Sequence, residues 1–273
     1  MLICQLTNST PVQMMGYVIR TECGRLIVID GGNYGQSKQL EEAIKRWGNK
    51  VDMWFLTHNH SDHYGSIIEL LKNNSDIEIC GLWRCNCSED VIECLPEDEK
   101  KEVNDWLKFE KECHIPLHKL AFGERFCVDN VNIEVLGTDN PEIKVNNLNN
   151  QSVVLKFLDD QFSIIFLGDL GVEGGKKLLQ TAEGKLKCTA VQMAHHGQSG
   201  VSFDVYDAIS PKYAFWPTPK WLWDNTQYLG GTPGMGHFKT PETINHMNKL
   251  NATHITSFLE NTIFDTKNDK SLL

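Results

Sequence analysis

Residues 51–63 run VDMWFLTHNHSDH, which is a short apolar stretch followed at once by three histidines and an aspartate. The stretch from Val51 to Leu56 is typical of a buried strand, and a helix is expected from Gly65 to Lys72. The polar residues therefore come where a buried strand ends. This order predicts a functional site at the edge of a sheet.

The polar residues after this strand are of the types that bind divalent metals. Zinc prefers neutral imidazole nitrogens and carboxylate oxygens. In a turn leaving a strand, alternate side chains converge, so His58 and His60 are expected to bind one ion while Asp62 and His63 face a second. The segment predicts a two-metal site, and an accidental polar loop is the alternative.

Potential ligands follow two further apolar strands of the sequence. The strand Phe162–Leu167 leads to Asp169, which is expected to bridge both ions. The strand Thr189–Ala194, taken as the last buried strand, leads to the adjacent residues His195 and His196. Neighbouring side chains point in different directions, so one is expected to bind metal while the other protonates the leaving group. We assign His195 to the metal and His196 to catalysis, and the reverse allocation stays open.

The remaining chain alternates strand-like and helical segments, without an internal repeat or a linker. We predict one domain over residues 1–273, with a helical insertion at about 80–120. Within this insertion, a helix is expected to begin near Pro96. Further strands are expected at Gly16–Arg20, Arg25–Asp30, Val131–Leu136 and Ser152–Leu158, and helices at Ser37–Trp47, at Gly175–Thr181 and from about Pro241.

These motifs resemble those of the metallo-β-lactamase superfamily, whose His-x-His-x-Asp-His pattern occurs here at His58, His60, Asp62 and His63. Supporting matches are Asp30-Gly31-Gly32, Leu167-Gly168-Asp169 and Ala194-His195-His196-Gly197. The resemblance implies an α/β fold, the four-layer αββα sandwich, and a metal-dependent hydrolase. Two divalent ions are implied, for which we expect zinc, although manganese or iron fits the same ligands.

Within the superfamily, the chain looks most similar to the soluble hydrolase-like domain of bacterial competence DNA-uptake channel proteins. The shared segments are Asn149-Asn150-Gln151-Ser152, Gly168-Asp169, His195-His196-Gly197 and Gly236-His237. Phosphorylcholine esterases look similar too. Both resemblances imply hydrolysis of a phosphodiester or phosphate ester more than opening of a β-lactam.

One departure from the family pattern concerns the first ion. Many relatives supply another metal-binding histidine between the first motif and the bridging aspartate, but His114 and His118 in that interval fall in the expected insertion. Asn149 or Asn150 takes that place, or His195 reaches across. The resemblance also makes His237 a candidate for the family's last metal ligand.

The mechanism that these residues imply is attack by an activated water. Two ions bridged by Asp169 would lower the pKa of a shared water towards about 7. Asp62 would both bind metal and orient that nucleophile. Asp30 would hold a metal-binding imidazole through its second nitrogen, and Asn150 is expected to support the site in the same indirect way.

Charge and composition narrow the partners. The net charge of −10 makes an extended nucleic-acid footprint unexpected, since such surfaces rely on clustered Lys and Arg, and leaves a small or short anionic substrate. No apolar run has the length of a membrane span, and the first residues lack the pattern of a signal peptide, so we expect a cytoplasmic protein without a membrane partner.

Two other functions fit the same residues. A lactonase or thioesterase would use the ions to polarise a carbonyl oxygen rather than a phosphoryl oxygen. A non-catalytic metal-binding or sensor protein would keep the fold without the activity. A panel of phosphate esters and lactones separates the first alternative, and metal content with activity after reloading separates the second.

Overall fold

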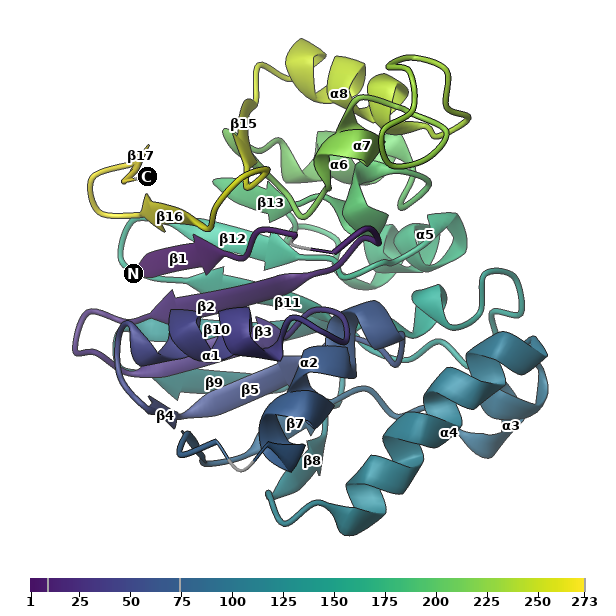
Figure 1. The fold of residues 1–273 in the computed structure, drawn as a ribbon. Helices are drawn as coiled ribbons and strands as arrows, with labels where there is room; N and C mark the ends of the chain where they lie inside the picture. The colour runs from purple at the N-terminus through teal and green to yellow at the C-terminus, as the bar shows by residue number, and fades with distance from the viewer. Residues whose placement is uncertain (9, 74, 273) are drawn as a thin grey trace.

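The computed structural model describes residues 1–8, 10–73 and 75–272, and two large β-sheets form its centre (Figure 1). The first sheet has the order β17 (Lys270–Ser271), β16 (Thr262–Asp265), β1 (Leu2–Gln5), β2 (Gly16–Arg20), β3 (Leu26–Asp30), β5 (Met53–Leu56), β7 (Leu82–Arg84), β8 (Leu117–Lys119). The second has the order β15 (Thr253–Thr256), β14 (Tyr213–Trp216), β13 (Ala190–Gln192), β12 (Ser163–Phe166), β11 (Val154–Leu158), β10 (Val131–Gly137), β9 (Arg125–Val128). The short strands β4 (Lys50–Val51) and β6 (Glu78–Ile79) pair with each other.

Alternation of side chains along the strands places the core between the two sheets. In β3, Ile27 and Ile29 face the second sheet and pack with residues such as Phe157 and Phe166. Val28, between them, faces the other way and packs under helices. Successive residues of a strand point to opposite faces, so a strand that is apolar throughout needs cover on both. Full burial of each such side chain contributes about 1.5–3 kcal/mol to the free energy of folding.

Helices cover the outer face of each sheet (Figure 1). On the first sheet, α1 (Ser37–Lys45), α2 (Ser61–Lys72) and α4 (Glu97–Glu112) contribute buried apolar residues to one outer cluster. On the second sheet, α5 (Val172–Thr181), α6 (Phe203–Ile209) and α8 (Thr240–Lys249) contribute to the other. The predicted α/β architecture, a four-layer αββα sandwich, is confirmed.

Two boundaries differ from the sequence prediction. α2 begins at Ser61 rather than Gly65, so Asp62 and His63 lie in its first turn and not in an extended turn. The reason is a long-range cap, because the backbone N–H of Ser61 donates to Oε2 of Glu102 at 2.7 Å. β13 is also not the last buried strand, since β14 continues the sheet in parallel and β15 follows it.

The segment around residues 80–120 is a crossover between parallel strands of the first sheet. β7 pairs with β5, and β8 pairs with β7, both in parallel. The helices α3 (Glu89–Glu93) and α4 connect β7 to β8, as a parallel pair requires. The ends of the expected insertion are therefore strands, and its middle is helical as predicted.

The two halves of the sandwich bring their strand ends together at one edge. β3 and β5 run in parallel in the first sheet, as do β12 and β13 in the second. Asp30, Thr57, Asp169 and His195 lie at or just after the ends of these strands. In the described part of the chain, no helix combines the length and apolar character needed to cross a bilayer.

Candidate metal centre

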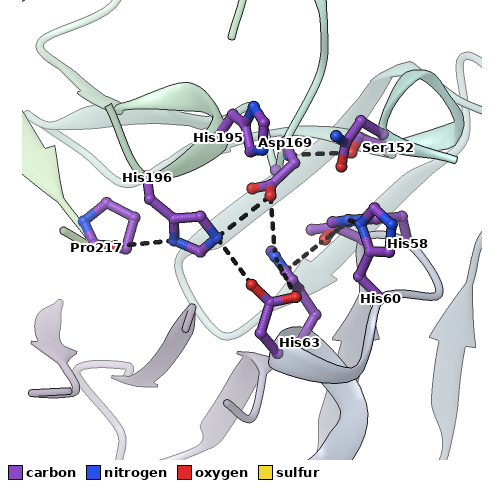
Figure 2. A network of polar contacts seen from close by, with 12 residues as sticks. His58, His60, His63, Ser152, Asp169, His195, His196 and Pro217 are labelled. Atoms are coloured by element: carbon purple, nitrogen blue, oxygen red, sulfur yellow. Dashed lines mark hydrogen bonds and ion pairs between the residues drawn. The ribbon is translucent and has the colours of Figure 1, made fainter. Parts of the chain in front are cut away.

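Four side chains from both halves of the sandwich converge at this edge. They are Asp62 and His63 in the first turn of α2, Asp169 after β12 and His196 after β13, and one ligand atom of each lies within 4.8 Å of the others. Oδ2 of Asp169 is 3.4 Å from Nε2 of His63 and 3.3 Å from Nε2 of His196. Oδ2 of Asp62 is 3.1 Å from the same nitrogen of His196. Figure 2 shows His63, Asp169 and His196 converging.

The outer nitrogens of both histidines are held by acceptors, which orients the inner ones. Nδ1 of His63 lies 2.6 Å from Oδ2 of Asp30. Nδ1 of His196 lies 2.9 Å from the carbonyl oxygen of Pro217. In each pair the acceptor oxygen requires the proton on Nδ1, so in the neutral ring the lone pair of Nε2 faces the cluster. This is the arrangement by which outer groups fix metal-binding imidazoles, with Asp30 as the outer group of His63.

Asp30 is itself fixed by Thr57, the residue that precedes the histidine motif. The Thr57 backbone N–H donates to Oδ1 of Asp30 at 2.7 Å, and the Thr57 hydroxyl donates to Oδ2 at 2.8 Å. Both carboxylate oxygens of a fully buried residue thus have partners. Burial raises the pKa of Asp30, although His63 and Thr57 oppose that rise. Asp30 therefore links the end of β3 to the motif after β5.

His58 and His60 form a second pair of donors beside the cluster. Nε2 of His58 and Nδ1 of His60 lie 2.9 Å apart, so the two nitrogens point at one another. Nδ1 of His58 lies 3.1 Å from the Thr57 hydroxyl, and the ring centroids of His58 and His63 are 4.2 Å apart (Figure 2). The pair is separate from the four-residue group but adjoins it, as two neighbouring ions require.

The turn that carries Asp169 is fixed by two polar residues that the sequence analysis gave no role. Gln192, buried in β13, accepts the backbone N–H groups of Leu167 and Gly168 at Oε1, both at 2.8 Å. Ser152 accepts the Asp169 N–H at 3.0 Å (Figure 2). Gly168 has φ +57, and an added Cβ would lie 2.9 Å from the Ser152 hydroxyl. The signal for Gln192 is a polar residue inside an apolar strand.

The adjacent histidines after β13 occupy different environments. Both have left-handed backbone conformations, φ 49 at His195 and φ 54 at His196. His196 is fully buried within the cluster. His195 is partly buried, and its Nδ1 lies 3.3 Å from the carbonyl oxygen of Ser199. Of the two, His196 lies in the four-residue group, and His195 lies beside it.

Asn150 and His237 lie outside the group of candidate ligands. Oδ1 of Asn150 accepts the N–H groups of Gly171 and Gly174 at 3.0 Å each, and its Nδ2 donates to the carbonyl oxygen of Val145 at 2.9 Å. Asn150 therefore caps α5, which follows Asp169, and has an indirect supporting position. His237 is exposed, and its ring stacks on that of Phe238 at 4.4 Å.

The buried atoms of the cluster fit a cation. Among the described residues, Nε2 of His63, Oδ1 of Asp169 and Nε2 of His196 are buried without a hydrogen-bond partner. Buried polar atoms normally have partners, so three atoms without a hydrogen bond on three side chains of one cluster indicate a missing ligand. Imidazole nitrogens with carboxylate oxygens are the donor set of zinc and related ions. The residues present therefore suit a divalent metal.

Protons would take the place of such an ion in the metal-free protein. Burial alone would lower the pKa of His196, but Asp169 and Asp62 raise it to about 10. Burial alone would also lower the pKa of His63, but the carboxylates of Asp169, Asp30 and Asp62 raise it well above its usual value. Burial acts to raise the pKa of Asp169, but His196 and His63 hold it well below its usual range. The cluster thus balances buried carboxylates with positive charge.

This balance predicts that the pH dependence of stability differs with and without metal. His196 has a folded pKa of about 10 against an ordinary value of 6.5, so its stabilising contribution is complete below about pH 6.5 and is lost as pH rises through 10. The metal-free protein should lose roughly 2–4 °C of Tm for each kcal/mol lost between pH 7 and pH 10. The zinc-loaded protein should lose less, because the ion replaces the protons. Parallel Tm curves for both forms would contradict the assignment.

Comparisons with known proteins agree with this architecture. The family model of the metallo-beta-lactamase superfamily matches residues 10–81, which include Asp30 and the whole histidine motif. Among curated proteins, none matches the sequence significantly. The structure is similar to the metallo-beta-lactamase fold protein YhfI from Bacillus subtilis, with a TM-score of 0.57 and 10% identity, over 97% of this chain and 100% of that one.

A second solved structure is similar over most of this chain. It is a variant of the CmlA beta-hydroxylase, with a TM-score of 0.58 and 10% identity, and the match covers 96% of this chain and 53% of that one. At this identity the likeness concerns the fold. The match to the family model concerns residues 10–81, which carry Asp30, His58, His60, Asp62 and His63.

Proposed function

We propose that this chain is a metal-dependent hydrolase that binds two divalent ions, zinc by preference, and cleaves a phosphodiester or phosphate ester. The observation that carries the proposal is the convergence of Asp62, His63, Asp169 and His196 around buried donor atoms that lack partners. These four residues would hold one ion and His58 and His60 the other, with Asp169 contributing to both.

When bound, such ions supply a nucleophile at neutral pH and polarise the bond that is attacked. The side chains of the chain do the rest. Asp30 and the carbonyl oxygen of Pro217 keep His63 and His196 oriented. Asp62, on the first turn of α2, orients the attacking water. We assign protonation of the leaving group to His195, which lies beside the cluster and is partly exposed to solvent, from which it can take up the proton it donates.

The substrate that we propose is small or short and anionic. Paired ions neutralise charge on the oxygens of a phosphoryl group and hold both its entering and leaving oxygens. The chain carries a net charge of −10, which repels an anion. The positive charge of the bound ions would therefore supply the attraction for the substrate. The resemblances to competence-channel domains and phosphorylcholine esterases favour the same substrate class and stay predictions.

A substrate panel on the zinc- or manganese-loaded protein tests this proposal. The panel holds bis-p-nitrophenyl phosphate, p-nitrophenylphosphorylcholine, an acyl-homoserine lactone and a thioester. We expect turnover of the phosphate esters to exceed that of the other two by at least about tenfold, which is about 1.4 kcal/mol of transition-state stabilisation. Faster turnover of the lactone or the thioester would show that the protein is a lactonase or thioesterase and not a phosphate esterase. No hydrolysis of any compound by protein with two bound ions would indicate a non-catalytic metal-binding protein.

The different positions of the adjacent histidines predict different losses on substitution. His195→Gln should keep both ions and lower kcat by about 10²-fold or more, the usual contribution of a positioned acid or base. His196→Gln should weaken metal binding as well, because Nε2 of His196 faces the cluster. Metal content and kcat measured on the same preparations check this. Full metal content in His196→Gln with metal loss in His195→Gln would restore the allocation expected from sequence.

A further inference from the structure

The four histidines of the site differ in how their outer nitrogens are held. His63 has Asp30, His196 has the carbonyl oxygen of Pro217, and His58 has the Thr57 hydroxyl at 3.1 Å. His60 uses Nδ1 towards His58. Its Nε2 has no hydrogen-bond partner within residues 1–8, 10–73 and 75–272. Metal-binding histidines almost always donate the second N–H to an acceptor. A metal-binding His60 would therefore need an acceptor close to its Nε2.

Helix α4 is fixed directly beside His60. Oε2 of Glu102 accepts the N–H of Ser61, the residue after His60, at 2.7 Å. The carbonyl oxygen of Glu102 accepts the Tyr64 hydroxyl at 2.8 Å, and the rings of Tyr64 and Trp106 are 5.4 Å apart. α4 is therefore attached to the first turn of α2 by polar and apolar contacts. The first turn of α2, which follows His60 directly, therefore lies against the face of α4 that carries Glu102.

Glu99 lies on that face and has an unused acceptor. It precedes Glu102 by three residues, so the two side chains are neighbours on the helix surface. The Glu99 side chain is partly buried, and its Oε2 is buried without a hydrogen-bond partner among the described residues. By contrast, Glu97 is 90% exposed at the side chain and pairs with Lys100 at 3.0 Å. Glu99 is thus the carboxylate of α4 that burial leaves without a partner.

The electrostatics of Glu99 are consistent with closeness to His60. Burial raises the pKa of Glu99, and among its neighbours His60 is the strongest influence in the opposite direction. Asp98 and Glu102 add to the rise. A partly buried carboxylate therefore has one favourable partner near it, and this partner is a residue of the histidine motif.

We propose that Glu99 is a positioning residue for His60, whose Nε2–H donates to the Glu99 carboxylate when Nδ1 binds the ion shared with His58. This inference rests on the two-ion site proposed above. It gives the crossover helix α4 a role, because α4 would supply from outside the sandwich the outer carboxylate that Asp30 supplies to His63 from within it. It also offers one support for an ion site that lacks the family's intermediate histidine.

Stepwise metal affinity tests this inference. Zinc is titrated into the metal-free full chain in competition with a chromophoric chelator, and native mass spectrometry gives the number of bound ions. Glu99→Gln should weaken the second, weaker ion about 10–100-fold, the usual effect of losing an outer-shell partner, and leave the first ion within about twofold. Glu97→Gln, on the same helix but exposed, should change neither. Glu99→Asp, which keeps the charge, should restore part of the lost affinity.

Three outcomes would overturn the inference. Unchanged affinity for both ions in Glu99→Gln would show that the carboxylate does not support His60. Equal loss of both ions with a lower Tm would show that Glu99 acts on the fold. Wild-type protein that binds fewer than two ions would overturn the proposed two-ion function together with this inference, whereas the first two outcomes leave the proposed function standing.

Discussion

Asp169→Asn should abolish nearly all hydrolysis, with kcat lower by about 10³-fold or more. The Asp169 carboxylate lies 3.4 Å from His63 and 3.3 Å from His196, and its Oδ1 is buried without a partner. An amide of the same shape removes the charge that would bridge the ions. Loss of several kcal/mol of stabilisation corresponds to this factor, at about 1.4 kcal/mol for each tenfold. Steady-state kinetics with the best phosphate ester, at fixed metal concentration, measure it.

The matched control is Asp160→Asn, which changes an exposed carboxylate in the turn between β11 and β12. It should keep full activity and metal content. Asp169→Asn should also bind less metal, and its thermal unfolding should no longer respond to added zinc as the wild type does, because ligand binding stabilises the folded state. A variant that keeps both ions and full turnover would contradict the bridging role of Asp169.

Asp30→Ala should cost about 3–5 kcal/mol of the free energy of unfolding of the metal-free protein. Asp30 is fully buried, lies 2.6 Å from Nδ1 of His63 and accepts two hydrogen bonds from Thr57. Removing it leaves Nδ1 of His63 and the backbone N–H of Thr57 without their acceptor inside the protein. Because His63 also loses its orientation, zinc affinity should fall about 10–100-fold. Urea unfolding and chelator competition measure the two effects.

Asp76→Ala serves as the comparison for that variant. Asp76 forms an exposed ion pair with Lys45 at 2.6 Å, and such surface pairs are worth about 0–1 kcal/mol. Its removal should leave zinc affinity unchanged. If Asp30→Ala were as stable as Asp76→Ala and bound zinc as tightly as the wild type, Asp30 would have no part in holding His63.

The sequence was sufficient to locate candidate site residues where these residues follow one strand within a few positions. The apolar run before Thr57 predicted β5, and the three histidines and one aspartate after it predicted the site. Asp30 and Asp169 could be placed for the same reason, since both come at or just after the end of an apolar strand. Local periodicity and strand-end position carry this information, because neither depends on contacts with distant residues.

Other features depend on contacts that no local pattern reveals. The start of α2 is set by Glu102, 41 residues away from Ser61. The allocation between His195 and His196 depends on two successive left-handed residues, which direct His196 to Pro217 and the cluster. β15 contains one apolar residue, Ile255, and was not expected. The role of Gln192 emerges from its contacts with the Asp169 turn.

The most direct test of the account is a crystal structure of the zinc-loaded protein with anomalous-scattering maps at the zinc edge. We predict one ion bound by Asp62, His63, Asp169 and His196, and a second between His58 and His60. A zinc ion bound elsewhere, with Asp169 away from the coordination sphere of either ion, would contradict the account.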